Sequence, residues 1–135
     1  MPFQPLKKAT LLMPSGPPDD PDRLHLWIIL TDPCAAHEAN LVVNVCTLHD
    51  GRFHDPACLI ERDEHRRVKH TSWVDYHRSK AVHSTALQKG VSAWLYHPDE
   101  PVSDALFNRI CAGLLESDHT SVRMRRYFEG KGPAF

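Results

Sequence analysis

Two histidines lie close to the ends of apolar runs, and each follows a polar residue by two positions. His25 comes two residues after Arg23, and His49 comes two residues after Thr47. A neutral imidazole is the side chain best matched to proton transfer near pH 7, so the two histidines are candidates for an acid–base pair. If the runs form neighbouring strands, both imidazoles can face the same end of a sheet. The alternative interpretation is a half-buried strand histidine at His25 and a loop histidine at His49.

Histidines and carboxylates in the middle of the chain offer a second chemistry, which is metal binding. The candidate ligands lie in predicted loops: His49, His54, His65, Asp50, Asp55 and Asp63. Imidazole and carboxylate ligands suit zinc and related ions, but these residues lack the spacing typical of zinc sites. The four cysteines form no close pair: Cys34, Cys46, Cys58 and Cys111. We therefore expect no metal, no other cofactor, and free, mostly buried thiols.

Short apolar runs separated by turn residues predict the strands that would position these side chains. Residues 24–30 and 41–46 are almost continuously apolar, which is typical of buried strands. Residues 14–22 hold four prolines and three aspartates and must form a loop. Asp50-Gly51 is a turn signal. The predicted strands are residues 9–13, 24–30, 41–47, 57–60 and 71–76, with residues 80–85 as an optional sixth.

One helix is predicted near the C-terminus, at about residues 103–116. Ser103 or Asp99 can cap its first turn. Apolar and small residues recur at helical spacing: Ala105, Leu106, Ile110, Gly113 and Leu114. The pattern predicts a mainly β fold, a small β-barrel of residues 1–121 with this helix packed on it. Residues 122–135 are expected to be a basic, loosely ordered tail.

Composition restricts the partners of the chain. It has 16 Lys and Arg against 17 Asp and Glu, a formal net charge of -1, so any site for anions must be local. A chain of 135 residues with 41% hydrophobic residues is typical of one globular domain. No run approaches the roughly 20 apolar residues of a membrane span, and prolines interrupt the N-terminal segment too often for a signal peptide. We expect a cytoplasmic protein with no membrane partner.

The order of the segments resembles that of the MazF/PemK-like toxins, which are small SH3-like barrels that cut single-stranded RNA. In that family a short strand precedes a loop ending in Arg, an apolar strand, a strand ending in Thr-Ser, a Ser-containing strand and a C-terminal helix. The matching segments here are residues 11–13, 23–29, 44–47, 71–74 and 103–115. Lys8-Ala9-Thr10 stands where the family usually has a Gly-Asp pair, and Leu48 replaces Ser after Thr47.

The resemblance implies a metal-independent endoribonuclease, a hydrolase of a toxin–antitoxin system. Arg23 would hold the phosphate through its planar guanidinium, and Thr47 would add a hydroxyl. His25 and His49 would transfer protons, giving a 2′,3′-cyclic phosphate and a 5′-OH. The implied partners are single-stranded RNA, an antitoxin protein and a second copy in a homodimer. The alternatives are an ion pair between Arg23 and an aspartate of residues 19–22, and an ordinary strand or turn position for Thr47.

A charged run at residues 61–70 precedes the Ser-containing strand. On a mobile loop, its basic side chains would track an RNA backbone while aromatic residues of the next strand stack on bases. The candidate RNA-binding residues are Arg66, Arg67, Lys69, Ser72 and Trp73, with Tyr76 as a second aromatic. Because the run holds both signs in near balance, the alternative is a solvated hairpin tip.

Two other functions are compatible with the same pattern. One is a non-catalytic SH3-like module that binds protein or nucleic acid, because one fold hosts many functions. Arg23 and Thr47 would then be dispensable, and exposed apolar residues around Trp73 and Trp94 would form the partner surface. The other is a histidine-based metal-binding protein.

Overall fold

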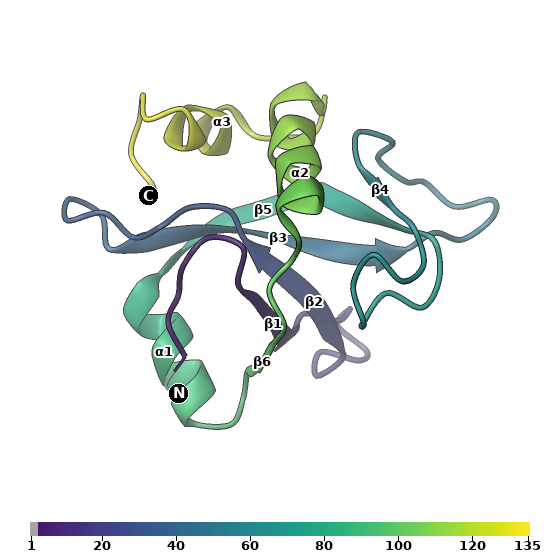
Figure 1. Cartoon of the computed structure of the whole chain (residues 1–135), viewed down its shortest axis with the longest axis horizontal. Helices are drawn as coiled ribbons and strands as arrows, with labels where there is room; N and C mark the ends of the chain where they lie inside the picture. Colours follow the sequence, from purple (N-terminus) through teal and green to yellow (C-terminus); the bar gives the residue numbers. More distant parts are fainter. Residues whose placement is uncertain (1–2) are drawn as a thin grey trace.

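Within residues 3–135, which the computed structural model describes, six antiparallel strands form one curved sheet (Figure 1). The strand order across the sheet is β4-β5-β3-β2-β1-β6. The strands are β1 Thr10–Pro14, β2 Leu24–Ile29, β3 Ala39–Thr47, β4 Leu59–Ile60, β5 Ser72–His83 and β6 His97–Asp99. This sheet confirms the prediction of a mainly β fold.

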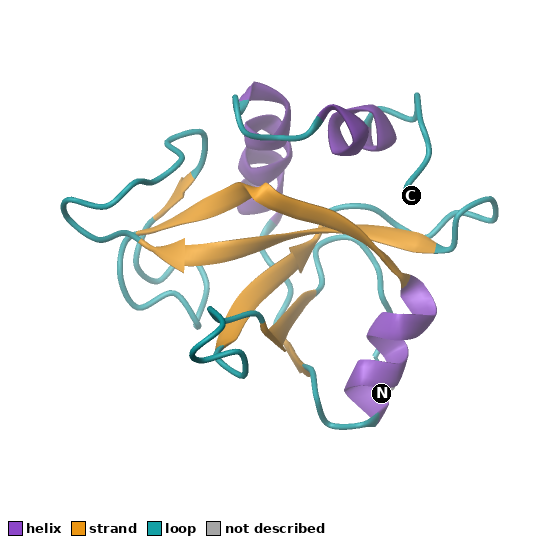
Figure 2. Cartoon of the chain, turned by 180° about the vertical axis from the view of Figure 1, so that it is seen from behind, coloured by secondary structure: helices purple, strands orange, loops and turns teal. Residues whose placement is uncertain are grey.

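The same residues form three helices, which lie on opposite sides of the sheet. They are α1 Ser84–Ser92, α2 Asp104–Glu116 and α3 Val122–Phe128. α2 and α3 lie over one face, and α1 lies on the other side (Figure 2). α2 occupies the predicted span, and Ser103 caps it by accepting a hydrogen bond from the Leu106 N–H at 3.1 Å. No helix within residues 3–135 is long and apolar enough to cross a membrane.

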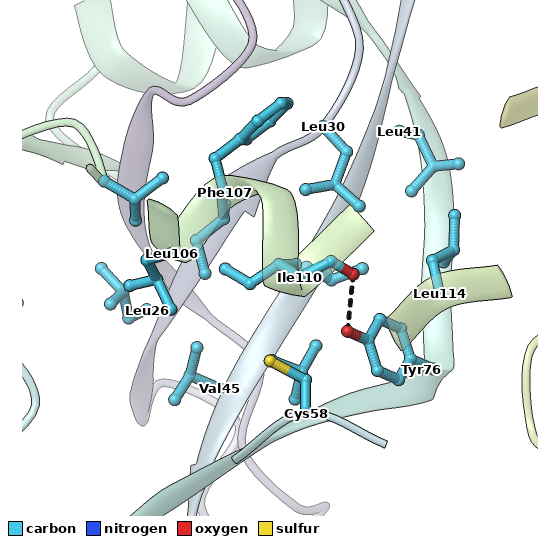
Figure 3. Close-up of a cluster of buried hydrophobic side chains, with 14 of the residues drawn as sticks. Leu26, Leu30, Leu41, Val45, Cys58, Tyr76, Leu106, Phe107, Ile110 and Leu114 are labelled. Carbon is cyan, nitrogen blue, oxygen red and sulfur yellow. Dashed lines mark hydrogen bonds between the residues drawn. The ribbon is translucent and has the colours of Figure 1, made fainter. Parts of the chain in front are cut away.

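The two faces of the sheet pack into separate hydrophobic clusters. The larger cluster lies under α2 (Figure 3) and includes Leu26, Ile28, Val43, Val45, Val74, Leu106, Ile110 and Leu114. The smaller cluster lies on the α1 side and consists of Leu11, Met13, Trp27, Ile29, Val42 and Leu87. Because β2 and β3 contribute to both clusters, their sequences are almost continuously apolar, and this is why they could be predicted.

Tyr76 of β5 joins the sheet to α2. Its ring is fully buried, and its hydroxyl donates a hydrogen bond to the carbonyl oxygen of Ile110 at 2.7 Å (Figure 3). Burial raises the pKa of Tyr76, so the phenol remains a donor at any physiological pH. A Cβ atom on Gly113 would collide with this hydroxyl. Glycine at position 113 therefore allows the helix to approach the tyrosine.

β5 is longer than predicted because its pairing with β3 continues past an irregularity. Asn44 pairs with Asp75, whereas Val42 pairs with Lys80, so residues 76–79 bulge out of the ladder. The Ser79 hydroxyl donates to the carbonyl oxygen of Tyr76 at 2.7 Å within the bulge. The predicted strands 71–76 and 80–85 are therefore one strand, which ends at His83 where α1 begins. α1 was not predicted, and no side chain caps its first turn.

The C-terminal tail, expected to be loosely ordered, contains α3 and packs on the sheet. Ser121 caps α3 by accepting a hydrogen bond from the Met124 N–H at 3.1 Å. Met124 and Tyr127 are buried, and the Tyr127 hydroxyl donates to the carbonyl oxygen of Ala39 in β3 at 3.1 Å. One apolar face is thus hidden among the basic residues of the segment.

Side chains, not a strand ladder, connect the two outer strands of the curved sheet within residues 3–135. Residues 61–71, between β4 and β5, reach β6. A ring nitrogen of His65 lies 2.7 Å from the carbonyl oxygen of Glu100, and the guanidinium groups of Arg66 and Arg67 each lie 2.5 Å from the Asp99 carboxylate. The sheet is therefore a half-barrel whose open side is bridged by this loop.

We predict that Gly113→Ala destabilises the protein, although alanine favours helices. In an exposed helix this change would increase the free energy of unfolding by about 1 kcal/mol. Here the new methyl group displaces the Tyr76 hydroxyl from Ile110, so we expect a net loss of about 2 kcal/mol in urea denaturation. Combining the change with Tyr76→Phe should cost less than the sum of the two single changes. A gain in stability from Gly113→Ala alone would contradict this packing.

Candidate functional site

A cleft of about 720 Å³ opens where β2 and β3 stop pairing. Their ladder joins only Trp27, Ile28 and Ile29 to Asn44, Val43 and Val42. Beyond it, residues 24–26 and 45–47 diverge (Figures 1 and 2). The cleft is lined by these two segments, by Leu12 and Arg23, and by residues of the following loops and β5: His49, Arg52, Phe53, Arg67, Val68, Lys69, His70, Ser72 and Trp73.

The cleft brings together most of the side chains that the sequence predicted for catalysis or RNA binding. Four of them were proposed to be catalytic, and all four line it: Arg23, His25, Thr47 and His49. Of the predicted RNA-binding residues, the cleft contains Arg67, Lys69, Ser72 and Trp73. Arg66 lies outside it, in a neighbouring hollow that Arg67 and Lys69 share. Sequence positions as far apart as 23 and 73 therefore form one site.

The lining of the cleft is cationic. It contains four permanently charged side chains, which are Arg23, Arg52, Arg67 and Lys69, together with His25, His49 and His70. No aspartate or glutamate is among the residues that line it. The chain as a whole has a net charge of -1, so the acidic residues are concentrated elsewhere. Any site for anions on this chain must be local, and this cleft has the positive charge that such a site needs.

Two of the four cations have an acidic partner outside the cleft. Arg23 lies 3.3 Å from Asp20, as the alternative interpretation expected, and both side chains are more than half exposed. Exposed pairs of this kind contribute little, so an anion in the cleft can replace Asp20. Arg67 is held by Asp99. Within residues 3–135, neither Arg52 nor Lys69 forms an ion pair, and both are available to a ligand.

His25 is half-buried at the start of β2 and is neutral at pH 7. Burial lowers the pKa of His25, and the nearby positive charges of Arg78 and Arg23 lower it further, against a smaller opposing effect of Asp75. Nδ1 of its ring lies 2.9 Å from the Ser15 hydroxyl oxygen. A neutral imidazole at the edge of an anion-binding cleft can accept a proton.

Thr47 and Ser72 lie directly opposite each other on β3 and β5. Ser72 is buried, and its hydroxyl donates to the carbonyl oxygen of His70 at 2.8 Å. The hydroxyl proton of Ser72 is therefore already in a hydrogen bond within the protein. Thr47 is exposed at the end of its strand and lines the cleft, and its hydroxyl forms no hydrogen bond inside residues 3–135. Of the two hydroxyls, Thr47 is the one available to a ligand.

Phe53 is the exposed aromatic side chain of the cleft. It is 67% exposed, whereas Trp73 is 8% exposed and packs edge-on against it with ring centroids 6.0 Å apart. Trp73 therefore packs against the Phe53 ring within the protein. Tyr76, the second predicted aromatic residue, lies in the core. Three further charged, aromatic or titratable residues of the lining were not predicted from the sequence: Arg52, Phe53 and His70. The position of Arg52 and Phe53 directly after the Asp50-Gly51 turn was the signal that could have revealed them.

Residues 61–71 are anchored, in contrast to the mobile loop or solvated tip that the sequence suggested. His65 is buried; its Nδ1 accepts a hydrogen bond from the Arg67 N–H at 3.1 Å, which leaves Nε2–H to donate to the carbonyl oxygen of Glu100. The Asp99 side chain has no exposed area. Its burial alone would raise its pKa, but hydrogen bonds from Arg66 and Arg67 outweigh this and hold the pKa of Asp99 well below its ordinary value.

The described residues contain no group of three His, Cys, Asp or Glu side chains that could hold a metal ion. Two of the candidate ligands of the metal hypothesis, His65 and Asp55, have other roles. Both ring nitrogens of His65 are hydrogen-bonded, and the Asp55 carboxylate accepts hydrogen bonds from the Ala57 N–H and the Ser117 hydroxyl. These contacts make Asp55 and His65 structural residues.

The thiols are free, as predicted. Cys46 lies at the cleft, but burial and the negative charge of Asp75 raise its pKa to about 11. Burial likewise raises the pKa of Cys111 to about 11. Both remain protonated at pH 7 and are poor nucleophiles. The prediction that the thiols are mostly buried was wrong, because only Cys58 is buried, Cys46 and Cys111 are half-buried, and Cys34 is exposed.

No family model, no curated protein and no solved structure matches this chain. A function for the chain is therefore inferred from the chemistry of the cleft.

We predict that Asp99→Asn lowers the free energy of unfolding by about 1 kcal/mol at pH 7, because two half-exposed arginines lose their shared carboxylate. The folded-state pKa of Asp99 is depressed, so this stabilisation is complete above its unfolded value of about 4 and disappears as the pH falls through the folded value. The difference between the two proteins in urea denaturation should therefore shrink in acid.

Asp104→Asn is the matched control, because Asp104 is 83% exposed and pairs only with Lys8 at the surface. It should have little effect at any pH. An equal effect of the two substitutions, or a difference that grows in acid, would contradict the role given to Asp99.

Proposed function

We propose that the cleft binds single-stranded RNA and cleaves it without a metal ion. The observation that supports this most directly is the lining itself. Four permanent cations, three histidines and no carboxylate surround a hollow that also contains an exposed phenylalanine. Cations favour the phosphate backbone, and an exposed aromatic ring stacks on an unpaired base of any sequence.

A single strand fits this site better than a duplex. Its bases are free to stack on Phe53, whereas the bases of a double helix are already stacked on one another. The basic surface is confined to the cleft of a chain with net charge -1, so it matches a few phosphates and not a long duplex. Arg52 and Lys69 would contact phosphates first, because they have no ion pair in residues 3–135.

The chemistry follows from the same side chains. His25, neutral at pH 7, removes the proton from the ribose 2′-OH, and the 2′ oxygen attacks the adjacent phosphorus. Arg23 leaves Asp20 and stabilises the charge that develops on the phosphoryl oxygens, with the Thr47 hydroxyl as a second donor. His49, in its protonated form, gives a proton to the departing 5′ oxygen. One P–O bond forms and one breaks, which leaves a 2′,3′-cyclic phosphate and a 5′-OH.

We also propose an SH3-like fold and a distant relationship to the MazF/PemK-like toxins, and the order of the elements is consistent with both. The half-barrel has its Arg23 loop, its strand ending in Thr47 and its Ser72 strand in the expected order, and α2 follows them. Arg23 and Thr47 line one groove, as an enzyme of this type needs. The proposal includes a homodimer and an antitoxin. Trp94 and Leu95 are 82% and 60% exposed and are candidates for such a contact, whereas Trp73 is buried.

A non-catalytic RNA-binding module is the second candidate. It is favoured by the contact between Arg23 and Asp20, which occupies the proposed phosphate-binding group, and by the exposure of Phe53. In this case the cleft would hold RNA through stacking and phosphate contacts alone.

We predict that the purified protein cleaves a mixed-sequence single-stranded RNA in excess EDTA. Arg23→Ala and His25→Gln should each lower the cleavage rate by about 100-fold, because each removes one catalytic task. Phe53→Ala should weaken RNA binding and leave the fold intact. Arg123→Ala, on α3 and not among the residues that line the cleft, is the control and should cleave normally.

Equal cleavage by all variants would place the activity outside the cleft. RNA binding that depends on Phe53, with no cleavage by any folded variant, would identify the non-catalytic module.

We predict that kcat/KM for cleavage, which reports the pKa values of the free enzyme, is retained at pH 6.5 and declines only at lower pH. Burial, Arg78 and Arg23 hold the pKa of His25 below 6.5, and the base must be neutral to act. Arg78→Gln removes one positive charge, so the pKa of His25 rises and the acid limb of the pH–rate profile moves to higher pH. Arg123→Gln should leave the limb in place. A limb centred above pH 6.5, or one that Arg78→Gln does not move, would exclude His25 as the base.

A further inference from the structure

Ser15 contacts one ring nitrogen of His25, Nδ1. The Ser15 hydroxyl oxygen lies 2.9 Å from Nδ1 of His25, 3.2 Å from Nε1 of Trp27 and 3.4 Å from the carbonyl oxygen of Met13. The backbone of Ser15 is also held, because its N–H donates to the carbonyl oxygen of Arg23 at 2.9 Å. Ser15 itself is not among the residues that line the cleft.

The three contacts of the Ser15 hydroxyl fix the direction of its hydrogen bonds. The Trp27 N–H can only donate, the Met13 carbonyl can only accept, and a serine hydroxyl has one proton and two lone pairs. All three contacts are hydrogen bonds at the same time only if the serine proton points to Met13. Both lone pairs then accept, one from Trp27 and one from His25. With all three bonds formed, including the longest one at 3.4 Å to Met13, His25 carries a proton on Nδ1.

We propose that Ser15, held by Trp27, is a positioning residue that keeps neutral His25 in the Nδ1–H tautomer and leaves Nε2 as the proton acceptor. Nε2 of His25 has no hydrogen-bond partner within residues 3–135. The tautomer itself follows from the hydrogen bonds, whereas its catalytic meaning rests on the proposed RNA cleavage. In the opposite tautomer Nε2 would carry a proton and could not act as a base.

Because of the charged groups around His25, its tautomer decides whether the ring can act as a base. Arg23 at the start of β2 and Arg78 in β5 disfavour the imidazolium, and Asp75 in β5 opposes them only in part. The ring therefore carries a single proton at pH 7, and its location decides the function. The same hydrogen bonds argue against Ser15 as a nucleophile, because both lone pairs of its hydroxyl are occupied.

Two-bond ¹H–¹⁵N correlation spectra of the full chain with ¹⁵N-labelled histidine test the proposal directly. His25→Gln identifies the His25 signals by their loss. At pH 7.5 we expect a protonated Nδ1 and an unprotonated Nε2 on His25. An unprotonated Nδ1 in the parent protein would overturn the proposal, whatever the protein does to RNA.

Ser15→Ala and Ser15→Thr separate the hydroxyl from the rest of the side chain. Loss of the hydroxyl should reduce the Nδ1–H population of His25 and lower kcat for RNA cleavage at least about tenfold. KM should be unchanged, because Ser15 does not line the cleft, and Ser15→Thr should restore both the tautomer and the rate. A tautomer unchanged in folded Ser15→Ala would also overturn the proposal.

The two readouts distinguish this inference from the proposed function. A confirmed Nδ1–H tautomer in a protein that does not cleave RNA removes the proposed nuclease and leaves the positioning role of Ser15. If the protein has the opposite tautomer and still cleaves RNA in a way that depends on His25, the proposed nuclease stands and the positioning role of Ser15 is wrong.

Discussion

One buried carboxylate connects the two sides of this half-barrel. Asp99 in β6 lies beneath the guanidinium groups of Arg66 and Arg67, with 2.5 Å contacts to each. Burying a carboxylate is costly unless it is fully paired, and two guanidinium groups provide that pairing. The cluster has one more positive than negative charge, so it leaves a net positive charge beside the cleft. Residues 61–71 form one wall of the cleft. The Asp99 contact and the neighbouring hydrogen bond from His65 to the carbonyl oxygen of Glu100 hold them in place.

The separation of β2 from β3 creates the space that this wall encloses. The ladder between them ends at Trp27 and Asn44. Asn44 is fully buried there, and its side-chain oxygen has no hydrogen-bond partner in the described residues. Past this point β2 continues beside β1 and β6, whereas β3 continues beside β5 and β4. Polar side chains at the diverging ends then face a hollow instead of a core.

Local patterns explain which parts of the fold could be predicted. β2 and β3 are buried on both faces and therefore read as apolar runs, and α2 combines a serine cap with helical spacing. α1 lacks a side-chain cap and contains Gly90, so its sequence gives a weak helical signal. α3 has a serine cap, but its three buried or half-buried apolar residues, Met124, Tyr127 and Phe128, stand among arginines that suggested a tail.

The candidate site was predictable only where it lies at strand ends. His25 and Thr47 belong to runs whose ends could be placed, so their meeting could be expected. Asp99 could not be assigned to Arg66, because 33 residues separate them and only the folded sheet brings them together. Phe53 looked like an ordinary loop residue, since its exposure beside Trp73 depends on how the loop folds over β5.

A general base surrounded by cations reconciles two requirements of the cleft. Positive charges attract the phosphate, but they also lower the pKa of a nearby imidazole. For His25 this is useful, because a lower pKa keeps the ring neutral at pH 7 and able to accept a proton, at the cost of weaker basicity. In the proposed nuclease, a bound phosphate would supply negative charge that offsets the cations, so the basicity of His25 would rise when RNA binds. Substrate binding would therefore strengthen the base at the step that needs it.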